Sequence, residues 1–275
     1  MRASALRAQV ETALGSRYGQ PFTFHERRIA ETVSCGISEV DAITGGLPRG
    51  GLTELFGPTS SGRTSLLVSL LAKMTAREEV CALIDAQDAF DPHSAQAAGV
   101  ELQRLLWLRC RGMEQALKVM DLLIHSGGFG LVALDVGDIP PRMVRRVPLA
   151  YWFRFQRAVE HTPTIVLLVE QESYAKSAAS LVLRLKNKVA HWSATSLEKG
   201  NTPSCLLDGL EINAEIVRSR ILVPQYNSSI ASFRTKTLWS LESDYPSTPK
   251  NDFQETRHEL RVYSYPEFSR SSRSA

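Results

Sequence analysis

Eight consecutive residues decide the fold of this chain: Gly57-Pro58-Thr59-Ser60-Ser61-Gly62-Arg63-Thr64. They match the phosphate-binding pattern G-x-x-x-x-G-K-[ST], except that Arg63 stands where the pattern has lysine. In such a loop, backbone N–H groups and the start of the next helix surround phosphate groups, and the Ser or Thr hydroxyl binds Mg²⁺. We therefore predict that these eight residues and Ser65 bind the phosphates of ATP, and that Thr64 binds the Mg²⁺ of the nucleotide.

The residues around the loop fit this prediction. A short run at residues 53–56 precedes the loop, and an apolar helix is predicted over residues 65–74. The motif requires strand, loop and helix in this order. It also needs an aspartate at the end of another strand, and Asp135 follows the apolar run at residues 131–134. We predict that Asp135 orders the Mg²⁺ through water; the alternative is that it only caps the turn before Pro140.

Both positions that carry the chemistry of ATP hydrolysis depart from the usual residues. Hydrolysis needs a group that orients the attacking water and accepts its proton, and at the expected carboxylate position the chain has Gln87. Loss of a general base costs roughly 10²- to 10⁴-fold in rate. Arg63 keeps a positive charge, but its side chain is larger and planar. We predict weak or absent hydrolysis and name no catalytic residue; the alternative is an active ATPase in which both replacements are harmless.

The composition is that of an ordinary globular protein. Hydrophobic residues make up 43% of the 275 residues and charged residues 22%, and the net charge of +3 does not by itself indicate nucleic-acid binding. The cysteines are widely separated, which favours free thiols over disulfides or a zinc site: Cys35, Cys81, Cys110 and Cys205. No apolar run approaches the roughly 18 residues of a membrane-spanning helix, and no signal peptide is recognisable. We expect a cytoplasmic protein without membrane contact.

Apolar runs alternate with helical patterns through most of the chain. Nearly continuous apolar runs are typical of parallel strands that are covered on both faces. The predicted strands span residues 80–85, 105–108, 131–135 and 164–171, followed by shorter ones at 181–185 and 210–217. The fold class is therefore α/β, with a mainly parallel central sheet, helices on both faces and antiparallel strands added at the C-terminal end.

Three regions are expected along the chain. Residues 1–35 are predicted to hold an N-terminal amphipathic helix, at about residues 4–15, and a linker or strand. Residues 36–240 form the core domain. Residues 241–275 are rich in serine, proline and charge, which predicts a flexible tail that binds a partner.

Several segments resemble successive motifs of the RecA recombinase family, in the same order: residues 36–50, 57–62, 84–92 and 114–117. The resemblance spans about residues 4–240 and implies a RecA-like P-loop core. It places Asp91 beside the adenine of ATP and Gln171 at the nucleotide-sensing position. It also implies that Arg218 and Arg220 reach the nucleotide of a neighbouring subunit in a homo-oligomer.

The same resemblance shows where this chain departs from the family. Ser94 stands at the position of a tyrosine that stacks on adenine, which implies weaker affinity for the base. The second DNA-binding loop is shortened to about residues 172–180, and the C-terminal domain of the family is missing. Both departures argue against strand-exchange activity.

A closer resemblance is to the ImuA branch of this superfamily, through residues 47–54, 145–150 and 178–185. Members of that branch are accessory proteins of mutagenic translesion synthesis in the SOS response to DNA damage. They work with ImuB, an inactive relative of Y-family polymerases, and with an error-prone C-family polymerase; RecA is a further expected partner. The resemblance implies assembly rather than catalysis. The alternatives are an active DNA-dependent ATPase or recombinase, and a regulator of RecA filaments or of cell division.

One region combines arginines with aromatic residues and coincides with the first DNA-facing loop of RecA relatives. Its candidate residues for DNA or a partner are Arg142, Arg145, Arg146, Tyr151, Trp152, Arg154 and Arg157. Arginines that hold phosphates beside aromatic rings that stack on bases suit single-stranded DNA. Two alternatives stay open: a surface for a partner protein, or a helix with an aromatic core face and a solvated arginine face.

Overall fold

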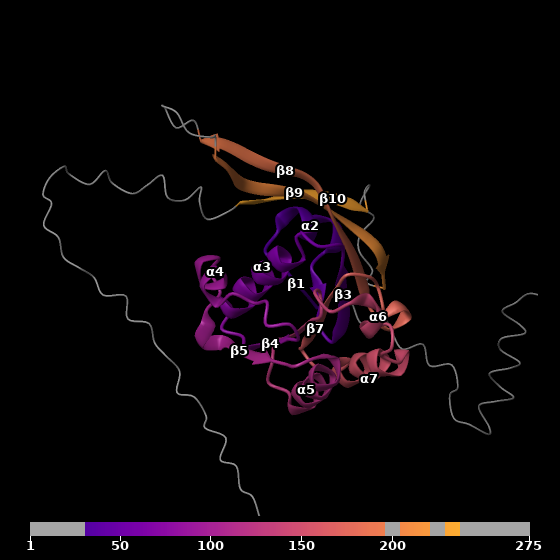
Figure 1. Ribbon diagram of the computed structural model, residues 1–275. Helices are drawn as coiled ribbons and strands as arrows, with labels where there is room; N and C mark the ends of the chain where they lie inside the picture. Colours follow the sequence, from indigo (N-terminus) through magenta and orange to yellow (C-terminus); the bar gives the residue numbers. More distant parts are fainter. Residues whose placement is uncertain (1–30, 196–203, 221–228, 237–275) are drawn as a thin grey trace, which may run out of the picture. The chain divides into compact units, whose positions relative to one another are not determined.

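The computed structural model describes residues 31–195, 204–220 and 229–236, and its centre is an eight-stranded sheet (Figure 1). The order of the strands across the sheet is β10-β9-β8-β3-β7-β6-β4-β5. Six of them run parallel: β3 (Gly51–Phe56), β4 (Cys81–Asp85), β5 (Leu105–Arg109), β6 (Leu131–Asp135), β7 (Ile165–Glu170) and β8 (Leu181–Thr195). The predicted fold class is confirmed, because the antiparallel strands that follow these six complete the sheet near the C-terminal end.

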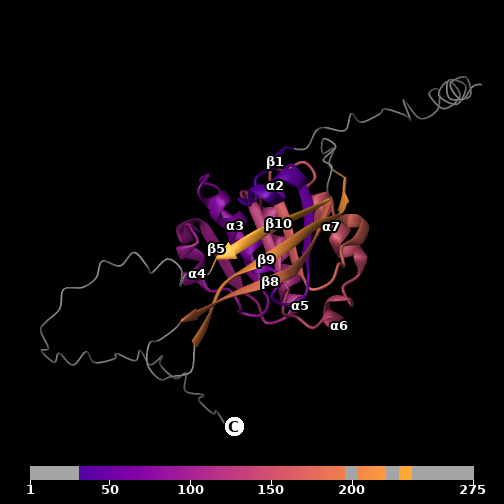
Figure 2. The same ribbon diagram turned by 90° about the horizontal axis from the view of Figure 1, so that it is seen from above.

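Helices cover both faces of the sheet, as Figures 1 and 2 show. The helices are α2 (Ser38–Thr44), α3 (Arg63–Thr75), α4 (Pro92–Ala97), α5 (Met113–Ser126), α6 (Pro141–Val144) and α7 (Leu149–Val159), with short 3₁₀ turns η1 (Leu102–Arg104) and η2 (Lys176–Ala178). Alternate residues of each parallel strand face opposite helical layers. In β4, Cys81 and Leu83 join the hydrophobic cluster around α3, whereas Ala82 and Ile84 join the cluster around α5 and α7.

The C-terminal strands correct one prediction. β8 (Leu181–Thr195) and β9 (Ser204–Ser219) form a long antiparallel hairpin, and β10 (Ile230–Lys236) pairs with β9. The prediction of short strands was wrong because the apolar alternation ends at Leu185, after which residues 186–189 are exposed. The ladder itself continues past this point through shifts in register between Asn187 and Val189 and between His191 and Trp192.

The remaining elements lie at the start of the described chain. β1 (Thr32–Val33) pairs with β2 (Leu47–Pro48) in a separate two-stranded sheet. The predicted N-terminal helix and the predicted tail lie outside the described residues. Cys35, Cys81 and Cys110 are buried free thiols, as predicted.

Candidate functional site

The predicted phosphate loop connects β3 to α3 at the carboxyl end of the sheet. Ser60 and Gly62 have positive φ angles of 59° and 89°. A Cβ on Gly57 would lie 2.3 Å from the carbonyl oxygen of Leu185, and one on Gly62 would lie 2.1 Å from Cδ1 of Ile212. Glycine is therefore needed at both places, because β8 and β9 press directly on the loop.

The loop leaves its anion-binding groups available. No side chain caps the start of α3, so the first N–H groups of the helix can bind an anion. Four other loop residues are exposed: Pro58, Thr59, Ser60 and Thr64. Ser61 is buried, and its hydroxyl has no hydrogen-bond partner. The arrangement fits a phosphate group held by main-chain donors.

Arg63 does not point freely into solvent. Its side chain starts at the first residue of α3, only 7% of the residue is exposed, and its Nη1 donates a hydrogen bond of 3.2 Å to the carbonyl oxygen of Gly137. Burial lowers the pKa of this guanidinium, and the nearby carboxylates of Asp135 and Asp138 oppose that effect. The Nε2 amide of Gln171 donates to the same carbonyl over 2.7 Å. The structure thus brings Arg63 and the predicted sensor residue together at Gly137.

Asp135 ends β6 next to this contact. One carboxylate oxygen accepts a 2.8 Å hydrogen bond from the backbone N–H of Gly137, so Asp135 caps the following turn, as the alternative interpretation proposed. Burial raises the pKa of Asp135 to about 6, and the charge of Arg63 acts in the opposite direction. Asp135 and Arg63 of the phosphate loop thus lie near each other beside Gly137, and the predicted contact of Asp135 with Mg²⁺ through water stays a prediction.

These residues fit a divalent cation poorly. A Cβ on Gly137 would lie 2.6 Å from Nη1 of Arg63 and 3.0 Å from Oδ1 of Asp135, so guanidinium and carboxylate flank the same residue. A cation held by Asp135 would therefore stand beside a fixed positive charge. No group of three or more His, Cys, Asp or Glu residues within the described ranges could hold a metal ion. We assign no step to Mg²⁺.

Gln87 lies in the loop that follows β4, and its residue is exposed. The loop is shaped by Asp85, which is buried and was missed as a site residue. Its carboxylate accepts hydrogen bonds from the backbone N–H groups of Gln87, Ala89 and Phe90 and from Nε1 of Trp107. An aspartate at a strand end before a polar turn was the signal in the sequence. Gln87 carries an amide and has no group that accepts a proton from water.

Asp91 serves first as a helix cap. Its carboxylate accepts from the backbone N–H groups of His93 and Ser94 at 3.2 Å and 3.0 Å, and from the hydroxyl of Ser94. These bonds to charged oxygens lower the pKa of Asp91. Its predicted contact with adenine stays a prediction.

The segment at residues 172–180 is fastened to the core from two sides. The buried Glu54 of β3 accepts hydrogen bonds from the hydroxyl of Ser173 and the backbone N–H of Ala175, at 2.7 Å and 2.8 Å. From β9 and the residue after it, Arg218 and Arg220 donate to the carbonyl oxygens of Ala179 and Ser177 at 2.7 Å and 2.5 Å. In this single chain the two predicted interface arginines therefore contact their own second loop.

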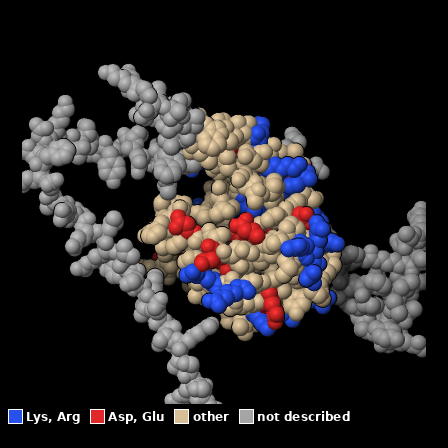
Figure 3. All heavy atoms as spheres, in the orientation of Figure 1, with Lys and Arg blue, Asp and Glu red and all other residues tan. Residues whose placement is uncertain are grey.

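Exposed arginines gather around α6. Figure 3 shows Lys and Arg side chains together over the place where α6 lies in Figure 1. Arg142 and Arg146 are exposed, and Arg145 forms a 2.6 Å ion pair with Glu172. A cavity of about 430 Å³ is lined by residues 144–149 and by Glu172, Ser173, Tyr174 and Lys176 of the second-loop segment. The predicted first and second loops therefore lie beside one cavity.

The aromatic half of the predicted surface needs a correction. Trp152 is 1% exposed and Phe155 is fully buried, with ring centroids 6.0 Å apart, so Trp152 belongs to the core and cannot stack on a base. Tyr151 is 36% exposed, and the guanidinium of Arg154 lies 4.8 Å from its ring centroid while pairing with Asp121 at 3.0 Å. Arg157 is exposed. The interpretation of α7 as a helix with an aromatic core face holds for Trp152.

Comparisons with known proteins agree with this geometry. Residues 5–143 match the family model described as the RecA N-terminal domain. The RecA protein of Deinococcus radiodurans is 36% identical over 138 residues, which are 49% of this chain and 38% of that protein. The RecA protein of Bordetella avium is 31% identical over 186 residues, 61% of this chain and 52% of that protein.

Two further findings complete the description. The chain spans about half or less of the length of the curated relatives it matches. Among the helices of the described ranges, none has the length and apolar character to cross a membrane. The phosphate loop, the strand order around it and the match over residues 5–143 lead to one conclusion: the chain belongs to the RecA family.

Proposed function

We propose that this chain is an ImuA-type accessory protein of the DNA damage response. In this proposal it supports mutagenic translesion synthesis through contacts with DNA and partner proteins, and it hydrolyses ATP weakly or not at all. One observation carries the argument: in a RecA-like site, the basic residue of the phosphate loop is held at Gly137 and the general-base position carries the amide of Gln87.

Weak nucleotide binding is part of the proposal. The main-chain donors of the loop suit the phosphates of ATP. Ser94 offers no ring on which adenine could stack, and its hydroxyl is engaged by Asp91. Arg63 is a bulkier cation than lysine and already has an acceptor in the protein. We therefore expect ATP to bind with modest affinity.

Contacts with DNA and partners are proposed for the surface around α6. Arg142 and Arg146 are exposed there, and guanidinium groups suit the phosphates of single-stranded DNA. The proposed partners are an ImuB-like inactive Y-family polymerase, an error-prone C-family polymerase, RecA and further copies of this chain. Support for the two polymerases comes from the ImuA-like segments of the sequence alone.

Restoring the usual residues tests the catalytic part. ATP hydrolysis is measured on single-stranded DNA for the wild type and for Arg63→Lys combined with Gln87→Glu. We expect wild-type activity at background and a gain of at least about tenfold in the double variant, because a lysine and a general base return together. Adding Asp135→Ala should abolish the gain. Fast wild-type hydrolysis that Asp135→Ala abolishes would contradict the proposal.

A second candidate is an active DNA-dependent ATPase and recombinase. The relatives that the comparisons found are named RecA proteins, and the phosphate loop differs from the family pattern at a single fixed position. Joint-molecule formation from homologous DNAs by the purified protein separates the two candidates. The recombinase forms such molecules, and the accessory protein does not.

A further inference from the structure

Arg63 occupies a central position between three parts of the site. It leaves the first turn of α3, reaches the loop after β6 and donates to the carbonyl oxygen of Gly137. That carbonyl also accepts from Gln171, which follows β7. One buried guanidinium therefore joins the phosphate loop to the ends of β6 and β7 without any bound molecule.

Two carboxylates lie near this guanidinium. The carboxylates of Asp135 and Asp138 both act on it electrostatically. A Cβ added to Gly137 would lie 2.6 Å from Nη1 of Arg63 and 3.0 Å from Oδ1 of Asp135. Both atoms therefore border the same small space beside Gly137. A guanidinium keeps its positive charge at any physiological pH, so this charge is permanent.

Arg63 also retains donors for a ligand. A guanidinium has five N–H donors, and within the described ranges Arg63 has one hydrogen bond, to Gly137. The remaining donors suit phosphate oxygens, which arginine binds in a two-pronged geometry. The same side chain can thus offset part of the negative charge of Asp135 and Asp138 and still donate to a phosphate.

We propose that the guanidinium of Arg63 replaces the divalent cation of this site, so that the phosphate loop accepts a nucleoside triphosphate without a metal ion. This inference rests on the proposed function, which supplies the nucleotide as its ligand. The exclusion of the metal ion depends on the protein alone. Mg²⁺ would have to displace a cation that is covalently part of α3.

The first test needs no nucleotide and uses Mn²⁺ as the probe, detected by electron paramagnetic resonance. Arg63→Met removes the charge, and Gly137→Ala keeps the charge but pushes Nη1 away. The exposed Arg111→Met serves as the control for loss of a charge. We expect the wild type and the control to leave Mn²⁺ free, and both site variants to bind it at least about fivefold more tightly, because carboxylate oxygens suit this ion.

A further substitution locates that binding. Adding Asp135→Asn to Arg63→Met should remove the gain, since a carboxylate ligand is lost. Wild-type protein that binds Mn²⁺ as tightly as Arg63→Met would overturn the inference. A site variant that gains no affinity would overturn it too, because no cation site would then lie beneath the guanidinium.

The second test measures ATP affinity by calorimetry, once with Mg²⁺ and once with EDTA. We expect the wild type to bind ATP with the same affinity, within about twofold, with Mg²⁺ and with EDTA. Arg63→Lys should bind ATP at least about tenfold more weakly with EDTA than with Mg²⁺. ATP binding by the wild type only with Mg²⁺ would refute the inference and leave the proposed nucleotide binding intact. No ATP binding in either condition, together with the expected Mn²⁺ results, would refute nucleotide binding and leave the inference intact.

Discussion

Glu170, the last residue of β7, has no exposed surface, and neither of its carboxylate oxygens has a hydrogen-bond partner. Burial, and then the neighbouring Glu54, raise the pKa of Glu170 well above its usual range. The folded state therefore binds a proton that the unfolded state releases at about pH 4.3. Stability from this group is complete at low pH and falls as the pH rises toward the raised pKa.

Glu170→Gln tests this prediction, because an amide mimics the protonated acid. Between pH 5 and pH 8, the free energy of unfolding of the wild type should fall relative to that of the variant by about 1 kcal/mol or more. Urea denaturation across this range measures the difference. The exposed Glu160→Gln should keep the wild-type slope. Equal slopes for wild type and Glu170→Gln would show that the carboxyl is not protonated in the folded protein.

Gly62 offers a second prediction at the scale of single residues. Gly62→Ala adds a clash with Ile212 to the strain of a positive φ, whereas Gly112→Ala, at a φ of 101°, meets no atom within 4 Å. We expect Gly62→Ala to lower the free energy of unfolding by at least about 2 kcal/mol more than Gly112→Ala. Adding Ile212→Val should recover part of the loss. Equal losses in chemical denaturation would mean that β9 does not press on the loop.

Single residues also show which parts of the site can be predicted from the sequence and which cannot. Asp135 was placed beside the phosphate loop because it ends an apolar run, and that reasoning held. Glu54 and Glu170 were not predicted as a buried pair, because each lies inside a strand pattern and their proximity depends on β3 and β7 being neighbours. Pairing between strands is a long-range property that no local pattern specifies.

At the scale of elements, α7 shows how a helix divides its faces. Trp152, Phe155 and Val159 are buried and follow helical spacing, so they form the core face. The sequence left open whether these aromatics belonged to the core or to a DNA surface. Packing against α5 and the sheet decides for the core, and the basic surface moves to α6 and the residues after it.

Two substitutions, one in α6 and one just after it, test that surface. Arg142→Ala combined with Arg146→Ala should weaken binding of a labelled single-stranded oligonucleotide. It should also reduce the slope of log affinity against log salt by about 1.4, because each phosphate contact contributes about 0.7. Fluorescence anisotropy at several salt concentrations measures both effects. Arg111→Ala is the matched control, and an unchanged slope in the double variant would remove α6 from the proposed DNA surface.

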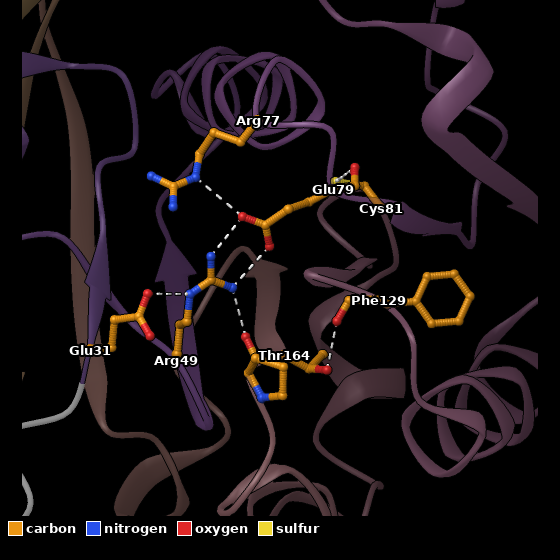
Figure 4. A network of polar contacts seen from close by, with 8 residues as sticks. Glu31, Arg49, Arg77, Glu79, Cys81, Phe129 and Thr164 are labelled. Atoms are coloured by element: carbon orange, nitrogen blue, oxygen red, sulfur yellow. Dashed lines mark hydrogen bonds and ion pairs between the residues drawn. The ribbon is translucent and has the colours of Figure 1, made fainter.

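A polar network fixes the opposite end of the sheet (Figure 4). Arg49, just before β3, pairs with Glu79 just before β4 through bonds of 2.9 Å and 2.6 Å, and it donates to the carbonyl of Pro163 at 2.8 Å. Only 9% of the Arg49 side chain and 22% of the Glu79 side chain are exposed, compared with 70% for its other partner, Glu31. The bonds from Arg49 lower the pKa of Glu79.

The two glutamates of this network form a matched pair of tests. Glu79→Gln should cost about 2 kcal/mol of unfolding free energy, because it leaves a largely buried guanidinium with the exposed Glu31 as its anionic partner. Glu31→Gln should change stability by less than about 0.5 kcal/mol, since its pair is solvated. Because the pKa of Glu79 is lowered, its contribution is present at neutral pH and lost as the pH falls through that value. Equal effects of the two substitutions would contradict this assignment.

Elements differ in how well their sequences predict them. The strands β4, β6 and β7 were found because both of their faces are covered, which leaves an apolar run. The edge strand β5 has an apolar run too, although its Leu106 is exposed. The outer part of the β8–β9 hairpin was missed because residues 186–189 are exposed and carry no such pattern. Main-chain pairing extends those strands, and the 2.6 Å ion pair between Lys188 and Glu211 links them across the hairpin.

At the scale of the whole molecule, the site is a product of the strand order. β3, β7, β6 and β4 are neighbours in the sheet, and their carboxyl ends bring Gly57, Gln171, Asp135 and Asp85 to one edge. The sequence placed Asp135 at a strand end and paired it with the phosphate loop, and the resemblance supplied Gln171, whereas Asp85 was not predicted as a site residue. The route of the Arg63 side chain to Gly137 depends on side-chain packing, which residue spacing does not encode.

The contact between the hairpin and the phosphate loop links two distant regions mechanically. Ile212 of β9 abuts Gly62, and the carbonyl of Leu185 in β8 abuts Gly57, with no spare space for even a methyl group. A protein that bound the outer part of this hairpin and bent it would therefore displace the phosphate loop. Binding at the hairpin and binding of phosphate at the loop would then be coupled.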